Sequence, residues 1–583
     1  MSLLNSMYQR RPPRLLRPLQ TTPSPWSSPD SFSKRPLYRT CRAWSCSAPL
    51  TLSSTNAFQG STGKHGKPTG EDEPRNHRTI GAAQFLFTGD GSSPGTPFFH
   101  PDGTHIFQKL TAFIRAQYPD YGFREVLTPT IYKDTLWKQS GHWENYKDDM
   151  FAVTGNTSKK PRKTKAPAEY INGVLQPQKF IHEEPDLDDY ALKPMNCPGH
   201  CLLYKSKRRS YRDLPIRYAE FSPLHRNETS GALSGLTRVR RFHQDDGHIF
   251  CRPSQIQDEV LKSIQFVKMV YKTLHFKKFD LSFFLSTRPN NCFMGTRQDW
   301  KMAEDQLIAA LDHDNENPEN LTSWEMRKGD GAFYGPKIDI TLRDNNGKEH
   351  QTATIQLDFQ LPKRFELEYE APAPELEAQG LMTDDPGLLG KVGRAAPVMI
   401  HRAVLGSLER FIALLLEHDD GKLPFWLSPR QVVILTITNR FHIVDHARNA
   451  KHKLSNTPAE NTSEPRRLDR PRYIVDIDDG SDSIAQKVVR ARKNKYNLIC
   501  VMGESNVKDG NGHGLQNMTL DVEVNRGSQP NIVETWDTIE RIRPGSQAPV
   551  QKDRGTGPNS GQSVKLTVKQ CKTLIESLSE KYL

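Results

Sequence analysis

The first strong hydrophobic pattern of the chain follows residue 102. Apolar residues recur there at one-turn spacing, which predicts a helix with one buried face. Asp102 can cap the start of this helix and Gly122 follows its end. The next residues, 125–130, favour an extended segment that includes Pro129. The apolar positions of the helix are Ile106, Leu110, Phe113 and Ile114.

A second pattern begins after a boundary near residues 423–429. Short apolar runs alternate with stretches of helical periodicity, which predicts a small α/β domain. The predicted strands are 432–435, 473–475, 498–501 and 520–524, and the predicted helices are 441–454, 483–494 and 563–579.

Three stretches lack such periodicity. Residues 154–190 change from a basic to an acidic block, which predicts an exposed, mobile insertion. Its basic half could touch a nucleic acid, or the whole stretch could be a plain solvated loop. Residues 365–397 contain several Pro and Gly and indicate a connecting loop. Residues 544–562 are rich in Pro, Gly, Ser and Gln and indicate a disordered insertion.

Charge adds a partner class to this picture. The 583 residues contain 80 Lys and Arg against 68 Asp and Glu, a net charge of +12. Such an excess suits a polyanion such as RNA, although part of it lies in the N-terminal segment. No run approaches the roughly 18 apolar residues of a membrane span. The eight cysteines form no CxxC pair, so free thiols in a reducing compartment are expected.

The first 70 residues differ from the rest. They hold ten Lys or Arg and a single acid, Asp30, and they lack the apolar core of a secretory signal. This composition predicts an organelle transit peptide for the mitochondrial matrix, with a disordered basic tail as the alternative.

Candidate chemistry lies in three blocks: residues 221–228 (FSPLHRNE), 238–248 (RVRRFHQDDGH) and 401–410 (HRAVLGSLER). An Arg-x-Glu pair alone is commonplace, and a surface salt bridge is its simpler interpretation. Together, however, the blocks resemble motifs 2 and 3 of the class II aminoacyl-tRNA synthetases, and their wording is most similar to the threonyl-tRNA synthetase family. The resemblance covers about residues 77–583 and implies adenylation of an amino acid by ATP, followed by transfer to tRNA.

Adenylation needs positive charge at the α-phosphate in the transition state. A planar guanidinium can grip phosphate oxygens with two hydrogen bonds. The resemblance implies that Arg226 contacts the α-phosphate and Arg410 the γ-phosphate of ATP, which carries Mg²⁺. It further implies an ATP site that includes Glu228, Arg238, Phe242, Gln351, Thr354 and Gly406.

One Cys and two His form a candidate metal site. Cys197, His248 and His401 lie 51 and 153 residues apart, so spacing alone favours buried structural residues. The resemblance instead identifies them as Zn²⁺ ligands with an open position. His200 and Cys201 are neighbouring alternatives that do not match the family pattern.

An open zinc position would read the amino group and the hydroxyl of threonine. Valine lacks that hydroxyl and would leave the site unsatisfied. The resemblance places Gln244, Asp246, Tyr334 and Gln356 at the threonine. It makes His142 a candidate proton acceptor in acyl transfer to tRNA. Thr352 stands where the bacterial pattern has a cysteine, and a mild effect on packing is expected.

The predicted architecture is α+β: a class II catalytic domain at 75–425, with an antiparallel sheet flanked by helices, followed by an α/β anticodon-binding domain at 428–583. The resemblance of the first helix and strand to motif 1 implies a homodimer. Expected partners are ATP, threonine and mitochondrial tRNA(Thr), without a membrane. Bacterial relatives carry an editing domain ahead of this region. Only about 75 residues precede it here, so activation of serine without a separate editing domain is expected.

Two other functions fit the sequence less well. A non-catalytic synthetase-like RNA-binding protein would be expected to lose phosphate-binding arginines or metal ligands, whereas all are present. Another class II synthetase, such as prolyl or seryl, would not carry the Cys/His/His set with Asp246. Class I enzymes are disfavoured because no HIGH or KMSKS block occurs.

Overall fold

The computed structural model describes residues 76–154, 190–276, 281–290, 293–316, 323–343, 349–457, 470–508, 518–543 and 563–583, and four short strands within 162–183. The predicted transit segment (1–70) and the predicted insertion at 544–562 lie outside the described residues. Within 154–190, strand β6 (Arg162–Lys165) pairs with β9 (Phe180–Glu183), and β7 (Tyr170–Ile171) pairs with β8 (Val174–Leu175). The predicted loop therefore contains two antiparallel ladders.

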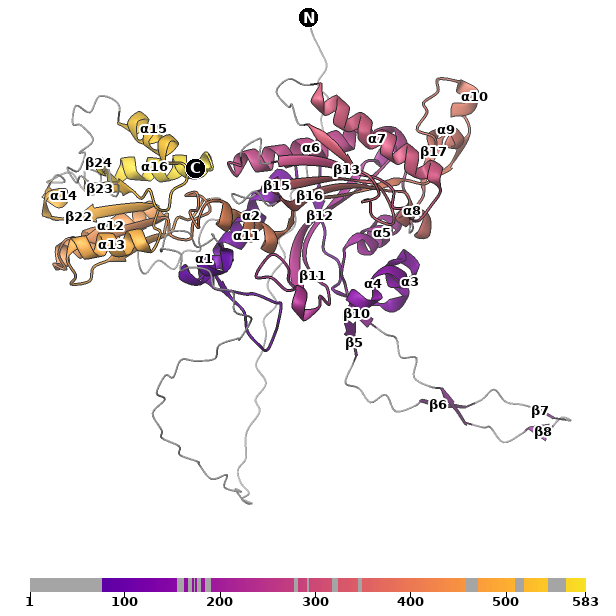
Figure 1. Ribbon diagram of the computed structural model, residues 1–583, viewed down its shortest axis with the longest axis horizontal. Coiled ribbons are helices and arrows are strands. Elements are labelled where there is room, and N and C mark those ends of the chain that lie inside the picture. The colour runs from indigo at the N-terminus through magenta and orange to yellow at the C-terminus, as the bar shows by residue number, and fades with distance from the viewer. Residues whose placement is uncertain are drawn as a thin grey trace, which may run out of the picture. The chain divides into compact units, whose positions relative to one another are not determined.

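An eight-stranded sheet forms the centre of the larger domain (Figure 1). Its pairings are antiparallel except at β3/β11 and β13/β14, which are parallel. The order is β14 (Trp324–Arg327), β13 (Leu281–Ser286), β15 (Lys337–Arg343), β16 (Glu349–Asp358), β19 (Val398–Ser407), β12 (Arg241–Cys251), β11 (Ile216–His225) and β3 (Arg124–Glu125).

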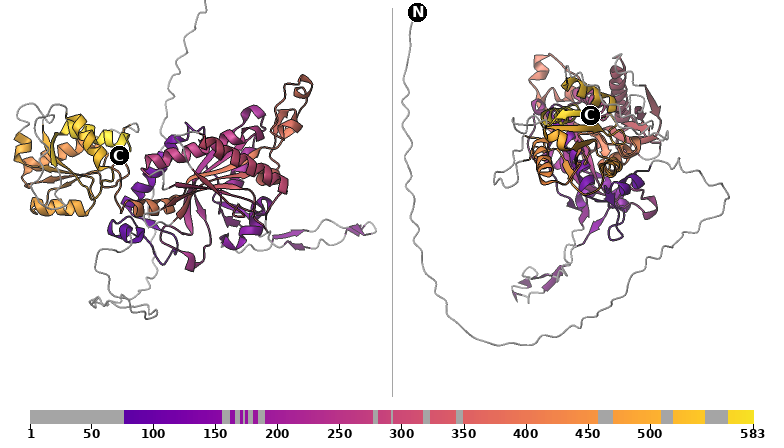
Figure 2. Two further views of the ribbon diagram at one scale, coloured as in Figure 1. Left: turned by 45° about the horizontal axis from the view of Figure 1, so that its top comes forward. Right: turned by 90° about the vertical axis from the view of Figure 1, so that its left-hand side faces the viewer.

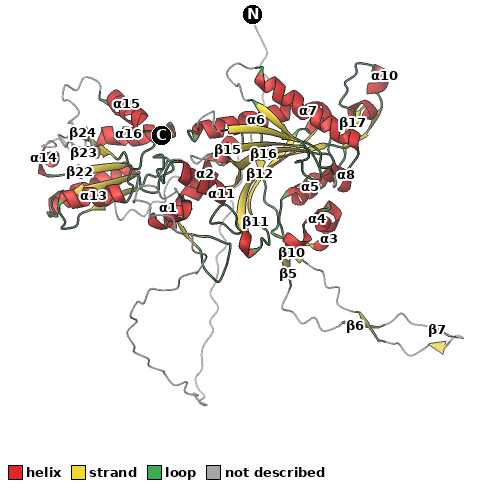
Figure 3. Cartoon of the chain, viewed as in Figure 1, coloured by secondary structure: helices red, strands yellow, loops and turns green. Residues whose placement is uncertain are grey.

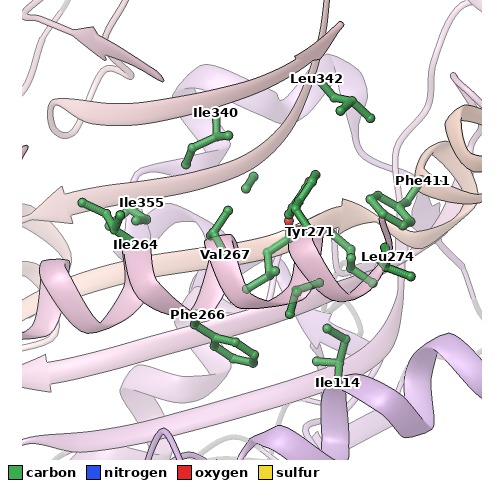
Figure 4. Packing of buried hydrophobic residues seen from close by; sticks show 14 of the residues in the cluster. Ile114, Ile264, Phe266, Val267, Tyr271, Leu274, Ile340, Leu342, Ile355 and Phe411 are labelled. Atoms are coloured by element: carbon green, nitrogen blue, oxygen red, sulfur yellow. The ribbon is translucent and has the colours of Figure 1, made fainter. Parts of the chain in front are cut away.

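Helix α6 (Ile256–Thr273) covers one face of this sheet, and α7 (Arg297–Asn315) packs beside it (Figure 2). Figure 4 shows Val267 and Tyr271 of α6 on the side of the helix that faces Ile340 of the sheet, with Phe266 on the other side of the helix. Alternate strand residues point into this core because side chains on a strand change face at every residue. The other face of β12, β16 and β19 is thereby left to form a site.

Helix α2 (Pro101–Gln117) confirms the first hydrophobic pattern, since Ile106, Leu110 and Ile114 are fully buried. The predicted cap is wrong: His100 is the N-cap residue and Asp102 lies inside the first turn. Asp102 instead accepts a hydrogen bond from Arg430 at 2.9 Å. Of the predicted extended segment, only the start belongs to a strand of the main sheet, as β3.

The prediction of a plain connecting loop at 365–397 is wrong. Strands β17 (Tyr369–Pro372) and β18 (Val392–Ala395) form an antiparallel pair there, with the short helices α9 (Pro374–Glu377) and α10 (Pro386–Leu389) between them. Tyr369, Ala371 and Ala395 form a small buried cluster with Leu214. Pairing with a partner about 25 residues away in sequence hides this ladder from local periodicity.

The C-terminal domain holds a five-stranded sheet with helices on both faces (Figure 3). Its strand order is β21 (Val475–Asp478), β20 (Val432–Thr436), β22 (Leu498–Met502), β23 (Thr519–Val524) and β24 (Ser563–Thr567). Its helices are α12 (Phe441–Ser455), α13 (Ile484–Lys493), α14 (Glu504–Lys508), α15 (Ile532–Ile542) and α16 (Val568–Glu580).

Three details of the C-terminal prediction are wrong. The helix predicted at 563–579 begins as strand β24, because Thr567 caps a helix that starts only at Val568. The strand predicted at 473–475 starts at Val475. Helices α14 and α15 are absent from the prediction.

Smaller elements complete the described chain, in which no helix is long and apolar enough to cross a membrane. They are α1 (His77–Ala83), β1 (Phe87–Thr88), β2 (Phe98–Phe99), β4 (Ile131–Lys133), α3 (Asp134–Ser140), α4 (His142–Tyr146), β5 (Ala152–Val153), β10 (Tyr190–Leu192), α5 (Cys197–Lys205), α8 (Gln360–Arg364) and α11 (Leu408–His418).

Candidate active site

A cavity of about 410 Å³ opens on the sheet face opposite α6. Residues at alternate positions of β12 line it, and so does β16 with Thr354 and Gln356, whose neighbours Ala353, Ile355 and Leu357 are buried in the core below. All the residues predicted for the site line this cavity except His142 and His248. They are Cys197, Arg226, Glu228, Arg238, Phe242, Gln244, Asp246, Tyr334, Gln351, Thr354, Gln356, His401, Gly406 and Arg410.

One end of the cavity is strongly positive. Arg226, Arg238 and Arg410 converge there, and Glu228, paired with Arg238 at 2.8 Å, is the acid among these lining residues. Burial, together with Arg226 and Arg238, lowers the pKa of the Arg410 guanidinium. Nε of Arg226 is buried and has no hydrogen-bond partner among the described residues. Guanidinium groups that converge on a cavity and have donors without protein partners suit a polyanionic ligand.

The positions of two of these arginines are fixed by their neighbours. Nε of Arg410 donates to the carbonyl of Thr237 at 2.9 Å, in the loop that carries Arg238. The guanidinium of Arg226 lies 5.0 Å from the centre of the Phe242 ring. The Phe242 ring, predicted to belong to the ATP site, therefore also contacts a predicted phosphate-binding arginine.

Asp339 orients the polar wall formed by β16. Its carboxylate accepts hydrogen bonds from the side chains of Gln351 and Thr354, and it pairs with Lys337 at 2.7 Å. Sequence analysis missed Asp339, which lies on β15 opposite Thr354. Lys337 and Asp339 are two residues apart and therefore lie on the same face of a strand, which was the sequence signal that could have placed Asp339 at the site.

Gly406 has a positive φ of 69°, and a Cβ there would lie 2.4 Å from the carbonyl oxygen of Thr352. Close approach of β19 to β16 therefore requires a glycine at this position. Thr352 itself is buried, and its hydroxyl donates to the carbonyl of Ile340 at 3.3 Å.

The other end of the cavity is suited to a small polar ligand. Asp246 is 6% exposed and accepts a hydrogen bond from the Asn196 amide at 3.0 Å. Gln356 donates to the carbonyl of Gly335 at 3.2 Å, and the Tyr334 ring lies 5.4 Å from that of His401. Gln244 lines the wall between this end and the arginines.

Cys197, His248 and His401 meet at this end, with one ligand atom from each within 4.8 Å of the others. All three side chains are buried. Nε2 of His248 lies 2.9 Å from Nδ1 of His401. The second ring nitrogens are held elsewhere: Nδ1 of His248 by Nδ1 of His200 at 2.7 Å, and Nε2 of His401 by Asp358 at 2.9 Å.

This arrangement fits a zinc ion. Asp358 accepts a hydrogen bond from the N–H at Nε2 of His401, which leaves a lone pair on Nδ1, directed at His248. Burial, and then His401 and His200, lowers the pKa of His248, so its ring is neutral. Two imidazole nitrogens facing each other across 2.9 Å, with a thiol beside them, suit a shared cation. Burial raises the pKa of the Cys197 thiol, and a bound zinc ion would deprotonate it.

The alternatives beside Cys197 have other contacts. His200 lies behind His248 and bonds to Glu220, while Cys201 contacts the Met399 sulfur at 3.9 Å. Neither lines the cavity.

His142 lies outside the cavity lining, buried to 1% exposure and close to Tyr146. Its Nδ1 contacts the Ser140 hydroxyl at 2.8 Å, and its Nε2 has no partner among the described residues. Burial lowers the pKa of His142 to about 4, so the ring is neutral at pH 7 and able to accept a proton.

Comparison with known proteins agrees with this site. The family model for the tRNA synthetase class II core domain (G, H, P, S and T) matches residues 179–379. A probable mitochondrial threonine–tRNA ligase of Schizosaccharomyces pombe is 45% identical over 437 residues, which are 75% of this chain and 83% of that protein. This chain belongs to the threonine–tRNA ligases. These ligases are class II aminoacyl-tRNA synthetases, so the predicted family, enzyme class and fold are confirmed.

Other threonine–tRNA ligases match over the same region. The mitochondrial ligase of Saccharomyces cerevisiae is 41% identical over 438 residues, covering 74% of this chain and 84% of that one. A probable cytoplasmic ligase of Dictyostelium discoideum is 43% identical, but the match spans only 54% of its length. The crystal structure titled the RNA binding domain of threonyl-tRNA synthetase from Cryptosporidium parvum has a TM-score of 0.64 at 36% identity and covers 86% of this chain and 98% of that one.

Proposed function

We propose that this ligase selects threonine with a zinc ion held by Cys197, His248 and His401, and charges mitochondrial tRNA(Thr). The observation that carries the proposal is the meeting of these three residues beside Asp246. Cys197, His401 and Asp246 line the same cavity as the arginines. The amino-acid end and the phosphate end then lie on one sheet face, as a reaction between threonine and ATP requires.

At the phosphate end, Arg226 grips the α-phosphate and Arg410 the γ-phosphate of ATP. Charge that develops on the α-phosphate is stabilised by donors already in place. Glu228 lies at this end with Arg238 and is the carboxylate next to the Mg²⁺-bound phosphates. Phe242, Gln351, Thr354 and Gly406 complete the ATP site.

At the amino-acid end, a zinc ion held by Cys197, His248 and His401 would supply an electrophilic position for the amino group and hydroxyl of threonine. Asp246 accepts the hydroxyl proton, and its buried carboxylate is held for this by Asn196. Gln244, Tyr334 and Gln356 form the wall around the side chain. Valine leaves these polar groups without partners, which costs far more than the loss of one methyl group does for serine.

Three further features belong to the proposal. The resemblance to mitochondrial ligases and the basic, acid-poor first 70 residues support delivery to the mitochondrial matrix. Leu127 follows edge strand β3 and is 83% exposed, which supports a homodimer through this segment. The separate C-terminal sheet supports the domain division near 425–428, with residues 428–583 binding the anticodon.

Amino-acid-dependent pyrophosphate exchange, measured with zinc content on the same protein, tests the proposal. We expect exchange with threonine, exchange with serine about 10–200-fold less efficient, and none with valine, at one zinc per chain. Equal exchange with valine, or full activity in protein without zinc, would contradict selection by the metal.

A further inference from the structure

A chain of buried side chains extends from the zinc-ligand candidate His248 away from the cavity. Nδ1 of His248 lies 2.7 Å from Nδ1 of His200, and Nε2 of His200 lies 3.0 Å from Oε2 of Glu220. Nζ of Lys193 donates to Oε1 of Glu220 at 2.9 Å. All four side chains are 0% exposed.

The contacts of this chain fix where each proton lies. Glu220 as a carboxylate only accepts, so Nε2 of His200 carries the proton between them. With that proton on Nε2, Nδ1 of His200 accepts a hydrogen bond from the N–H at Nδ1 of His248. The lone pair of His248 is thereby left on Nε2, the atom that faces His401.

Glu220 is held in its charged form at the end of the chain. Burial alone would raise its pKa, but the His200 hydrogen bond, the Thr128 backbone N–H and the Lys193 ammonium lower it to about 2. The Thr128 hydroxyl donates to Oε2 at 2.9 Å. A buried carboxylate with this many donors has a single orientation, and it can transmit that orientation to His200.

Asp358 performs the same task for the other histidine in one step. Its Oδ2 accepts from Nε2 of His401, and its Oδ1 accepts the backbone N–H groups of Gln360 and Leu361. His248 reaches a fixed carboxylate only through His200. Both candidate ligands are therefore linked to a carboxylate that is held in place by hydrogen bonds. His401 is linked directly, and His248 is linked through one intervening histidine.

We propose that His200 and Glu220 are positioning residues that set the tautomer and orientation of His248 as a zinc ligand, with Lys193 holding the charge of Glu220. This proposal rests on zinc binding as proposed above. Hydrogen-bond partners of metal-bound histidines commonly contribute about 10–100-fold to metal affinity. We expect a loss of zinc affinity of that size when the contacts of His200 are removed.

The test uses the full chain and measures zinc affinity by competition with a chromophoric chelator. His200→Leu removes both contacts and should weaken zinc binding 10–100-fold, with a raised KM for threonine and an unchanged KM for ATP. His200→Asn keeps an acceptor near the position of Nδ1 and should bind zinc more tightly than His200→Leu does. In Co²⁺-substituted protein, the visible absorption bands should shift in His200→Leu.

Glu377→Gln is the matched control. Glu377 is a buried acid of the same domain, bonded to Arg252 at 2.6 Å and to the Tyr369 hydroxyl at 2.7 Å, and it does not line the cavity. This change should lower stability and leave zinc affinity unchanged. Equal loss of zinc in Glu377→Gln and His200→Leu would overturn the proposal, because general destabilisation would explain both.

Two further outcomes separate this proposal from the one on which it rests. If wild-type protein binds zinc and the zinc affinity of folded His200→Leu is within twofold of wild type, only the positioning role of His200 and Glu220 is overturned. If wild-type protein binds no zinc, the proposed selection of threonine by zinc is overturned, and the positioning role of His200 and Glu220 is overturned with it. Should His200→Leu not fold, Glu220→Gln takes its place, and an unchanged zinc affinity in that variant is the overturning result.

Discussion

The carboxylate of Asp245 accepts a hydrogen bond from Nη1 of Arg402 at 3.1 Å, and both side chains are fully buried. The same carboxylate accepts the backbone N–H groups of Val404, Leu405 and Gly406, at 2.7, 2.9 and 3.0 Å. Asp245 therefore fixes the end of β19, after which α11 carries Arg410 into the cavity.

Asp245→Ala should destabilise the catalytic domain and impair ATP binding together. It leaves the Arg402 charge buried without a partner, a change that costs about 3–5 kcal/mol. It also frees the β19 segment that positions Arg410, so the KM for ATP should rise. Urea unfolding and exchange kinetics measure the two effects.

Glu259→Ala is the control for this prediction. Glu259 is a buried acid paired with Arg217 at 2.6 Å, away from the cavity lining. Its loss should lower stability with little change in the KM for ATP. An unchanged KM for ATP in Asp245→Ala would show that the β19 segment keeps its position without the carboxylate.

The family resemblance named the residues of the cavity lining, and these residues lie in compact blocks that local spacing also groups. Gln244 and Asp246 share one strand face at a spacing of two, and Arg226 with Glu228 follows the neighbouring strand. The metal ligands are different. Cys197 and His401 are 204 residues apart in the sequence, and only the family resemblance, not local spacing, linked them.

The residues that sequence reasoning missed act through partners on other strands. Asp339 on β15 orients residues of β16, and Asp245 on β12 braces β19. Such pairs depend on strand order and register, which a single sequence does not display. The same reason hid the β17/β18 ladder. Strand β24 was missed because its five residues run directly into a helix.

Arg410→Ala should reduce threonine-dependent pyrophosphate exchange by about 10²–10³-fold, the usual effect of removing one preorganised donor to a developing charge. Arg410→Lys should recover little, since an ammonium cannot form the paired hydrogen bonds of a guanidinium. Arg394→Ala, at an exposed arginine paired with Glu368, is the control and should leave exchange unchanged. Recovery of full exchange by Arg410→Lys would exclude a bidentate role.

His142→Ala should separate the two half-reactions. If neutral His142 accepts the ribose proton during acyl transfer, its loss should slow transfer to tRNA by about 10²–10⁴-fold and leave adenylation unchanged. Single-turnover transfer from preformed threonyl-adenylate measures the transfer rate, and pyrophosphate exchange measures adenylation. Because His142 lies outside the cavity lining, an unchanged transfer rate would assign it to packing against Trp137 and Tyr146 instead.

His105 should make stability depend on pH in the acid range. It lies half-buried on α2, with Nε2 unpartnered among the described residues, and burial followed by Lys109 lowers its pKa to about 4. Between pH 6.5 and 4 the unfolded chain therefore binds a proton that the folded chain does not, so stability falls as the pH falls.

His105→Leu should remove this contribution. Between pH 7 and 5, the free energy of unfolding should fall by about 1 kcal/mol less in the variant than in wild type. This figure allows for solvent screening at the partly exposed ring. Urea unfolding at each pH gives the comparison. Above pH 7.5 His105 is neutral in both states, so the two proteins should there show parallel pH dependence. Parallel curves down to pH 5 would mean that His105 takes up its proton in the folded chain as readily as in the unfolded one.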